Sequence, residues 1–105
     1  DTAERYDPVA DGWQTLAPLP TARGGSGVAL SSGQVVVAGG EDAARVYPQV
    51  EALDLATGRW SSLPPMPTPR HGLALVTVAG TVYALVGGTS AGVSPSAVTE
   101  SLAIP

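Results

Sequence analysis

The 105-residue sequence contains no cysteine and no lysine, and each absence removes a class of function. Without cysteine the chain has no disulfide, no thiolate zinc site and no cysteine nucleophile. All five basic residues are arginines that stand singly, against nine acidic residues, for a net charge of −4. Nucleic acids and anionic membranes are therefore not expected as partners, because both need a basic stripe that neutralises phosphates.

Long apolar segments are also missing. No hydrophobic run approaches the roughly 18 to 20 residues that cross a bilayer, and residues 1–6 lack the basic start and apolar stretch of a signal peptide. The chain starts at Asp1 rather than Met, so we expect a piece excised or processed from something longer, with any targeting signal outside it. Its lysine-free use of Ala, Gly and Arg is typical of a GC-rich bacterial genome.

The residues that are present predict an all-β fold. Hydrophobic residues make up 44% of the chain and charged residues 13%, the balance of a folded domain. Thirteen Gly and ten Pro interrupt the sequence and disfavour long helices. Short apolar runs bounded by Gly, at residues 27–30, 35–38, 73–78 and 82–86, are typical of buried strands.

The sequence repeats itself with a period of 47 residues. The run WQTLAPLPTARGG from Trp13 aligns with WSSLPPMPTPRHG from Trp60. At the same offset ERYD at residues 4–7 aligns with EALD at 51–54, and Gly33 with Gly80. The pair Gly39-Gly40 recurs as Gly87-Gly88 at an offset of 48. Such a period indicates a repeat architecture.

These landmarks resemble the kelch motif. The motif elements are an apolar strand ending in a Gly pair, a variable loop, E-x-[YL]-D, a Trp and L-x-P-[LM]-P-T-x-R, and together they cover essentially the whole chain. The resemblance implies a β-propeller with four-stranded antiparallel blades. We expect the tryptophans to pack between blades. The motif residues predicted to be structural are Glu4, Tyr6, Asp7, Trp13, Gly39, Gly40, Glu51, Asp54, Trp60, Gly87 and Gly88.

The fold class is therefore predicted as all-β, a kelch-type β-propeller fragment with one full blade flanked by two half-blades. Labelled A to D from axis to rim, the full blade at residues 23–69 has strands at 25–31, 34–38, 50–55 and 59–63. The half-blade at 1–22 has C and D strands at 3–7 and 12–16. The last unit, at 70–105, has A and B strands at 72–78 and 81–86 and an extra C-like strand at 97–104.

Such a wedge leaves strand edges and apolar faces uncovered, which favours association. The A and B strands of one chain can complete the blade begun by the C and D strands of another. We expect head-to-tail assembly, in which three chains close a ring of six blades as a homo-oligomer. The extra C-like strand would then duplicate the first strand, so one of them must be displaced or lie on an outer edge. The alternative is a fragment of a larger single-chain propeller, from a kelch-containing bacterial enzyme. Divergence between the two copies favours a natural origin over an engineered one.

Catalytic chemistry is not predicted. His71 is the only histidine, and the sequence shows no recognisable acid, base or nucleophile beside it. Some kelch-family members resemble galactose oxidase, but this chain lacks the Cys for a cross-linked Tyr and the histidines for copper. We therefore expect no metal and no cofactor. A non-catalytic binding or scaffold module, the common role of kelch propellers, is the predicted function.

Charged residues at repeated positions divide into framework and ligand candidates. Glu4, Glu51 and Glu100 share one repeat position, so we expect them to be structural, each paired with an Arg from a neighbouring strand or loop.

The family resemblance implies ligand contacts from the loops that follow strands D and B, around the channel. The matching positions after strand D are Arg23, Gly24, Arg70 and His71, whereas the loops at 41–49 and 89–96 match only as loops. A peptide or small anionic ligand is the expected partner. For His71 the alternative is a loop histidine without a ligand.

Overall fold

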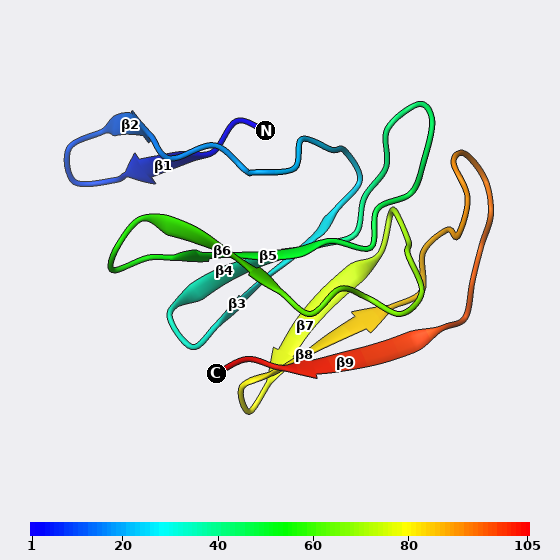
Figure 1. The fold of residues 1–105 in the computed structure, drawn as a ribbon. Coiled ribbons are helices and arrows are strands. Elements are labelled where there is room, and N and C mark those ends of the chain that lie inside the picture. Colours follow the sequence, from blue (N-terminus) through cyan, green and yellow to red (C-terminus); the bar gives the residue numbers. More distant parts are fainter.

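The computed structural model describes residues 1–105 as nine strands in three antiparallel sheets (Figure 1). The sheets are an N-terminal hairpin of β1 and β2, a central sheet in the order β3-β4-β5-β6, and a third sheet in the order β7-β8-β9. No helix in it is long and apolar enough to cross a membrane. The strand bounds are β1 Glu4–Asp7, β2 Gly12–Thr15, β3 Gly27–Ser31, β4 Gln34–Ala38, β5 Val50–Asp54, β6 Arg59–Leu63, β7 Ala74–Val78, β8 Thr81–Leu85 and β9 Thr99–Ala103.

The all-β prediction is confirmed. Strands β4 and β6 have the predicted bounds, and the others begin or end one or two residues inside the predicted ranges. The extra C-like strand, β9, lies on the outer edge of the third sheet and pairs with β8. It therefore occupies the edge that a C strand from a second chain was expected to use.

Two-residue turns set the register of β3 with β4 and of β7 with β8. Ser32 and Gly33 have φ of 50° and 75°, and Ala79 and Gly80 have φ of 48° and 78°. Two successive positive φ values match a type I′ turn, whose twist suits a β-hairpin. The same device therefore recurs 47 residues later in the chain.

Aspartate side chains hold the turns that follow β1 and β5. The carboxylate of Asp7 accepts hydrogen bonds from the backbone N–H groups of Val9 and Ala10. Asp54 accepts them in the same way from Ala56 and Thr57. Backbone donors of a tight turn need such partners, which gives the last residue of the E-x-[YL]-D run a structural role.

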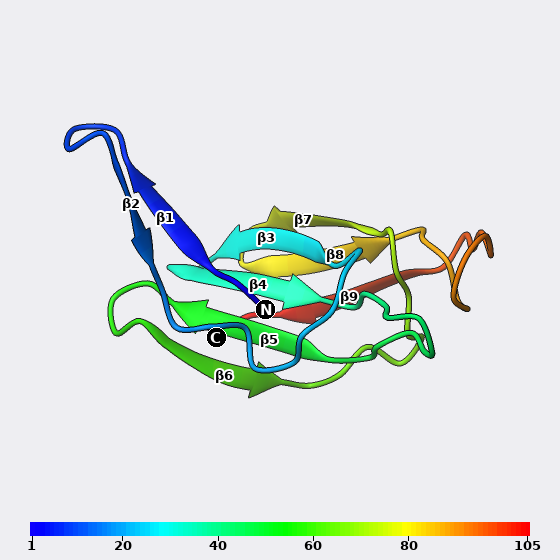
Figure 2. The same cartoon turned by 90° about the horizontal axis from the view of Figure 1, so that it is seen from above.

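The hydrophobic core lies between the central sheet and the third sheet (Figure 2). Alternate residues of each strand point into it, as the pleat requires. Met66, from the proline-rich connection, and Leu73, just before β7, are buried with them. The buried core residues are Val36, Ala38, Val50, Ala52, Met66, Leu73, Val82, Ala84 and Ile104. The core thus joins the two copies of the repeat.

The predicted match of Gly39-Gly40 with Gly87-Gly88 is wrong by one residue. Gly24 exchanges backbone hydrogen bonds with Glu41, and His71 exchanges them with Gly88, so Glu41 and Gly88 are equivalent and 47 residues apart. The equivalent of Gly39 is therefore Val86. Both have left-handed backbones, with φ of 65° and 56°.

The loop between the second and third strands differs between the copies. Isolated bridges join Glu41 to Val46 in the first copy and Gly88 to Pro95 in the second. The second loop is therefore two residues longer. This insertion accounts for the offset of 49 between Glu51 and Glu100.

The N-terminal hairpin extends away from the other two sheets (Figure 2). Trp13 is 71% exposed and contacts the ring of Tyr6 across the hairpin, with centroids 5.3 Å apart. The expectation that Trp13 packs between blades is thus not met, because no sheet faces it here. Trp60 does reach a neighbouring segment, since its indole N–H donates to the carbonyl oxygen of Ala17 at 2.8 Å.

Candidate functional site

The loops expected to bind a ligand gather at one end of the sheets. They are the β4–β5 loop (residues 39–49) and the β8–β9 loop (residues 86–98), which project on the same side in Figure 1. The first connector (residues 16–26) and the second connector (residues 64–73) reach the same end, because Gly24 bridges to Glu41 and His71 bridges to Gly88. We call this set of four segments the loop end.

Arg23 is buried at the loop end and ties the first connector to the central sheet. Its Nη1 donates to Glu51 Oε2 at 2.6 Å, and its Nε donates to the carbonyl oxygen of Gly39 at 2.6 Å. Thr21 donates to the other carboxylate oxygen of Glu51 at 2.8 Å. The side chain of Arg23 is 0% exposed and that of Glu51 is 4% exposed. The pair is therefore internal.

Arg70 repeats this arrangement in the third sheet. Its Nη2 donates to Glu100 Oε2 at 2.9 Å, and its Nη1 donates to the carbonyl oxygens of Val86 and Val98 at 2.8 and 2.6 Å. The Arg70 side chain is 0% exposed, and that of Glu100 is 18% exposed. Each arginine thus fastens its connector to the ends of the second and third strands of the sheet that follows.

The expected pairing of a repeated Glu with an Arg is confirmed for Glu51 and Glu100. Glu4, at the same repeat position in β1, is exposed. Neither Arg23 nor Arg70 presents its guanidinium to solvent in this fold. Their predicted contact with a ligand stays a prediction, and their observed contacts are those of a framework.

His71 connects the two loops through Glu41. Its Nδ1 lies 3.1 Å from Glu41 Oε1, and its Nε2 lies 3.0 Å from the carbonyl oxygen of Ser90. The second oxygen of Glu41 accepts from the backbone N–H of Gly92 at 3.3 Å. A Cβ on Gly88 would overlap the His71 ring, so the glycine makes room for the imidazole. Sequence reasoning missed Glu41 because it is 30 residues away.

Arg45 is an exposed cation that sequence reasoning also missed. Its guanidinium stacks 4.6 Å from the centroid of the Tyr47 ring, and Tyr47 raises the pKa of Arg45 above its ordinary value. The Tyr47 hydroxyl donates to Asp42, whose carboxylate also accepts from the backbone of Ala44 and Arg45. These hydrogen bonds, with that of Tyr47 the largest, lower the pKa of Asp42. These contacts within the β4–β5 loop therefore hold its charged tip in one conformation.

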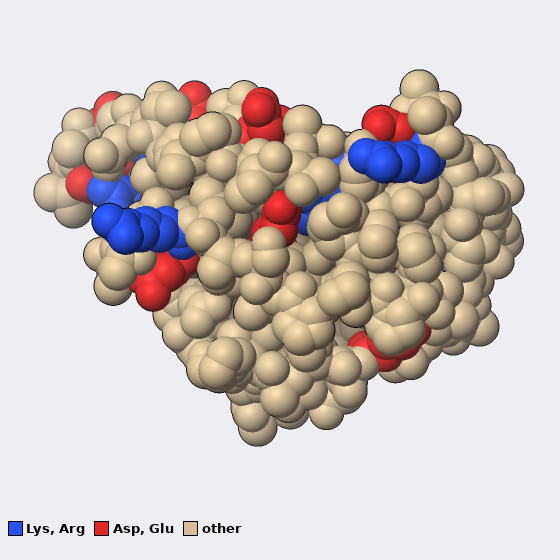
Figure 3. Space-filling view, viewed as in Figure 1, with Lys and Arg blue, Asp and Glu red and all other residues tan.

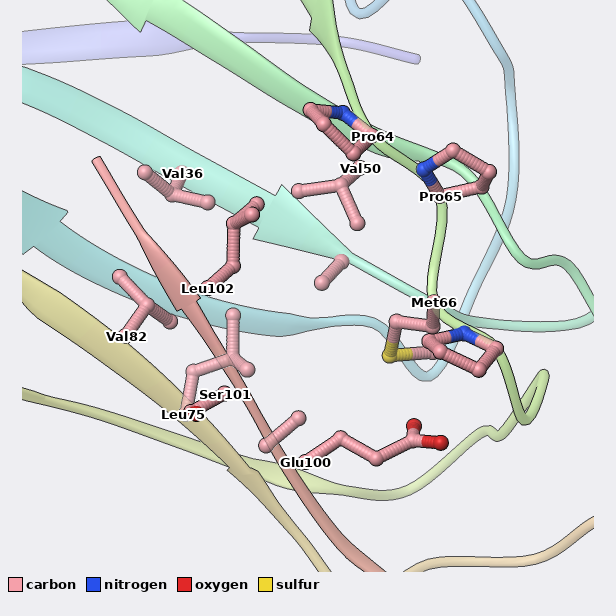
Figure 4. A pocket seen from close by; sticks show the side chains of 13 residues that line it. Val36, Val50, Pro64, Pro65, Met66, Leu75, Val82, Glu100, Ser101 and Leu102 are labelled. Atoms are coloured by element: carbon pink, nitrogen blue, oxygen red, sulfur yellow. The ribbon is translucent and has the colours of Figure 1, made fainter. Parts of the chain in front are cut away.

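Two hollows lie against the faces of the sheets, where the connectors also line them. A cavity of about 210 Å³ sits between the central and third sheets, and the side chains of Pro64, Met66 and Leu102 line it (Figure 4). A groove of about 490 Å³ separates the N-terminal hairpin from the other face of the central sheet, where Val28 and Leu53 lie. Both hollows are mainly apolar.

Charge is sparse on the surface. On the face shown in Figure 3, acidic and basic side chains form small separate patches on a largely uncharged surface. No group of three or more His, Asp or Glu side chains is placed to hold a metal ion. The loop end is therefore distinguished by preorganised backbone and by a few charges of both signs.

Comparison with known proteins identifies the central repeat. Residues 22–67 match the kelch motif family, and this range contains the whole central sheet, β3 to β6, with the Arg23 and Glu51 pair. The match covers one of the two copies, and the second copy follows from the equivalent hydrogen bonds around Arg70 and His71. No curated protein matches the chain in sequence. The chain thus contains a kelch motif, which forms its complete four-stranded sheet.

Proposed function

We propose that this chain is a non-catalytic protein-interaction module of a kelch β-propeller, with its binding surface at the loop end. Kelch repeats generally serve as binding scaffolds rather than as catalysts. The two loops and the tips of the two connectors form the surface, and the sheets are the rigid support.

The bridge made by Glu41 is the observation that carries the proposal. One carboxylate holds His71 and the backbone of Gly92, so loops from successive repeats form one continuous surface before any ligand arrives. A surface that is ordered in advance loses less conformational entropy on binding. Gly24 and His71 are the surface members of the predicted ligand set. Arg23 and Arg70 contribute by fixing the connectors from inside.

The charges at the loop end favour a peptide that carries a carboxylate. Arg45 is exposed and stacked on Tyr47, which fixes its planar guanidinium for a two-pronged contact with a carboxylate. Asp42 and Glu41 lie in the same loop. Their carboxylates can accept hydrogen bonds from the backbone N–H groups of a peptide, whereas they would repel a free anion.

A scaffold role through self-assembly is the second part of the proposal. Three chains in a head-to-tail ring would supply six blades. The exposed faces on both sides of the wedge support this part, with Val28 56% exposed on the central sheet and Val78 60% exposed on the third sheet. The rival is a larger single-chain propeller, in which further blades of the same chain cover these faces.

A displayed library of random peptides, selected on the immobilised chain, tests the binding surface. Peptides that are enriched should bind the wild-type chain in calorimetry, and Arg45→Ser should weaken them about tenfold, the size of one charged hydrogen-bonded contact. Arg59→Ser is the matched control, because Arg59 is exposed at the start of β6, beside the β5–β6 turn. The proposal fails if no peptide is enriched, or if the Arg45 and Arg59 variants bind equally well.

A further inference from the structure

Strands β1 and β9 both correspond to β5, the third strand of the central sheet. In the central sheet β5 pairs with β4 on one side and with β6 on the other. The strand β9 pairs on one edge with β8, which corresponds to β4, and no strand pairs with its other edge. The strand β1 pairs on one edge with β2, which corresponds to β6, and no strand pairs with its other edge. The N-terminal hairpin therefore has the pair of strands that would complete the third sheet, if it replaced β9 on β8.

The carboxylate that pairs with the buried Arg70 has a repeat counterpart in the N-terminal hairpin. Glu100 of β9 pairs with Arg70 in this structure, as Glu51 of β5 pairs with Arg23. Glu4 of β1 stands at the same repeat position and is exposed. If β1 of a second copy lay along β8 in the register of β9, Glu4 would reach Arg70.

A tryptophan contact gives an independent match. The indole of Trp60 in β6 donates to the carbonyl oxygen of Ala17 in the first connector. The residue 47 positions after Ala17 is Pro64, which lines the cavity between the two sheets (Figure 4). The repeat equivalent of Trp60 in the hairpin is Trp13, which is 71% exposed. A hairpin docked on β8 in place of β9 would place the indole of Trp13 beside the carbonyl oxygen of Pro64.

The apolar faces of the two sheets are complementary in the same arrangement. In this structure Leu75 and Val82 of the third sheet pack against the side of the central sheet that carries Val36. The equivalents of Leu75 and Val82 in the central sheet are Val28 and Val35, on its other side, where Val28 is 56% exposed. Docking of a second copy would cover that side with the outer face of a third sheet.

We propose that the open side of the third sheet binds a second copy of this chain, whose N-terminal hairpin displaces β9 from β8. Glu4 of that copy then pairs with Arg70, and the indole of its Trp13 donates to the carbonyl oxygen of Pro64. This inference rests on the assembly part of the proposed function and is independent of the ligand part.

The side chain of Val86 limits how closely the second copy can approach the third sheet. Where the third sheet docks on the central sheet, Gly39 lies so close to the carbonyl oxygen of Arg70 that a Cβ would overlap it. The second copy would bring the carbonyl oxygen of its Arg23 to the equivalent residue, which is Val86. The wild-type chain therefore associates weakly, and Val86→Gly should associate at least about tenfold more tightly, since a backbone oxygen cannot move as a flexible side chain can.

Sedimentation equilibrium of the wild-type chain and its variants, Val86→Gly included, tests the exchange. Glu4→Gln should weaken association about tenfold without changing the thermal unfolding of the monomer. Glu100→Gln should strengthen association, because it loosens β9 and leaves Arg70 in need of a carboxylate. The double variant should associate less than Glu100→Gln alone. Asp1→Asn is the matched control for charge near the N-terminus and should behave as wild type.

The proposal is overturned if the wild-type chain and Val86→Gly both remain at the monomer mass of 10.5 kDa at every concentration. Association that Glu4→Gln leaves unchanged, alone and in the Glu100→Gln background, also overturns it. Arg45→Ser should associate as wild type does, so loss of peptide binding and loss of association are separate outcomes. Should Glu100→Gln fail to fold, Glu4→Gln and Val86→Gly still decide the question.

Discussion

At the scale of single residues, the buried charges explain how this chain positions its loops. A guanidinium taken out of water must be neutralised and must find acceptors for its donors. Arg70 has Glu100 and the carbonyl oxygens of Val86 and Val98, all of them at the ends of strands that flank a loop. The arginine side chain therefore replaces solvent at a point where several backbone carbonyls converge.

Removal of one charge from such a pair should be costly. Glu51→Gln leaves the guanidinium of Arg23 buried without a counter-charge, and we expect the free energy of unfolding to fall by about 3 kcal/mol. Urea denaturation followed by tryptophan fluorescence measures it. Glu4→Gln is the matched control at the same repeat position, and at low protein concentration it should change stability by less than about 0.5 kcal/mol. Equal effects of the two substitutions would contradict the framework role.

Val86 is strained in the isolated chain. A β-branched residue at φ of 56° is sterically unfavourable, and its side chain is 50% exposed, so little burial compensates for the strain. Val86→Gly should raise the free energy of unfolding by about 1 kcal/mol. Val78→Gly is the control, because Val78 lies in a regular strand, and it should lower stability. A Val86→Gly variant less stable than wild type would show that the left-handed backbone is not formed.

At the scale of elements, capped turns define where strands reverse. The carboxylates of Asp7, Asp42 and Asp54 each accept two backbone hydrogen bonds in a turn. Backbone donors lower the pKa of Asp7 and Asp54 below the ordinary value of 3.8, and Tyr47 together with backbone donors does the same for Asp42. Ionised aspartates therefore belong to the folded state.

The pH dependence follows from the sign of these shifts. A depressed pKa in the folded state stabilises it fully above the unfolded value, here 3.8, and the contribution is lost as pH falls through the folded pKa. We expect the urea midpoint to be flat above about pH 5 and to fall steadily below about pH 4. Asp54→Asn keeps an acceptor and removes the titration, so its curve should fall less. A midpoint that does not change between about pH 5 and pH 2 would contradict this turn-capping account.

Most strands could be predicted, whereas the residue-by-residue alignment of the two copies could not. Runs of Val, Leu and Ala bounded by Gly locate β3, β4, β7 and β8, because turn residues mark the ends of short strands. The one-residue error at the Gly pair arose because sequence alignment favours glycine on glycine. Backbone hydrogen bonds instead align Val86 with Gly39.

The candidate site could be predicted as a place but not as a set of contacts. Because Arg70 and His71 follow strand D, the sequence predicted that they lie at the loop end. Their acid partners, Glu100 and Glu41, are each 30 residues away in the sequence. The β8–β9 loop contains no Arg and no Tyr, so the repeat pattern could not indicate the stacking of Arg45 on Tyr47. Local patterns cannot supply such partners, since the fold brings them together.

At the scale of the whole molecule, the chain is a wedge with one complete sheet at its centre. The core joins the central and third sheets, while the N-terminal hairpin has no comparable contact with either. Large apolar side chains remain exposed on both outer faces, including Leu30 at 63% and Val78 at 60%. Monomeric proteins seldom leave such faces uncovered, so the wedge is suited to have neighbours on both sides.

Amide hydrogen exchange, resolved strand by strand in dilute solution, tests the central claim that two stacked copies of the repeat form the folded unit. Strands β4, β5 and β8 have partners on both sides and should exchange slowest, β9 should be protected along its β8 edge, and the N-terminal hairpin should exchange fast. Raising the concentration should slow the hairpin and expose β9. A β9 that exchanges as fast as the hairpin in dilute solution, or a hairpin as protected as β4 there, would contradict the account.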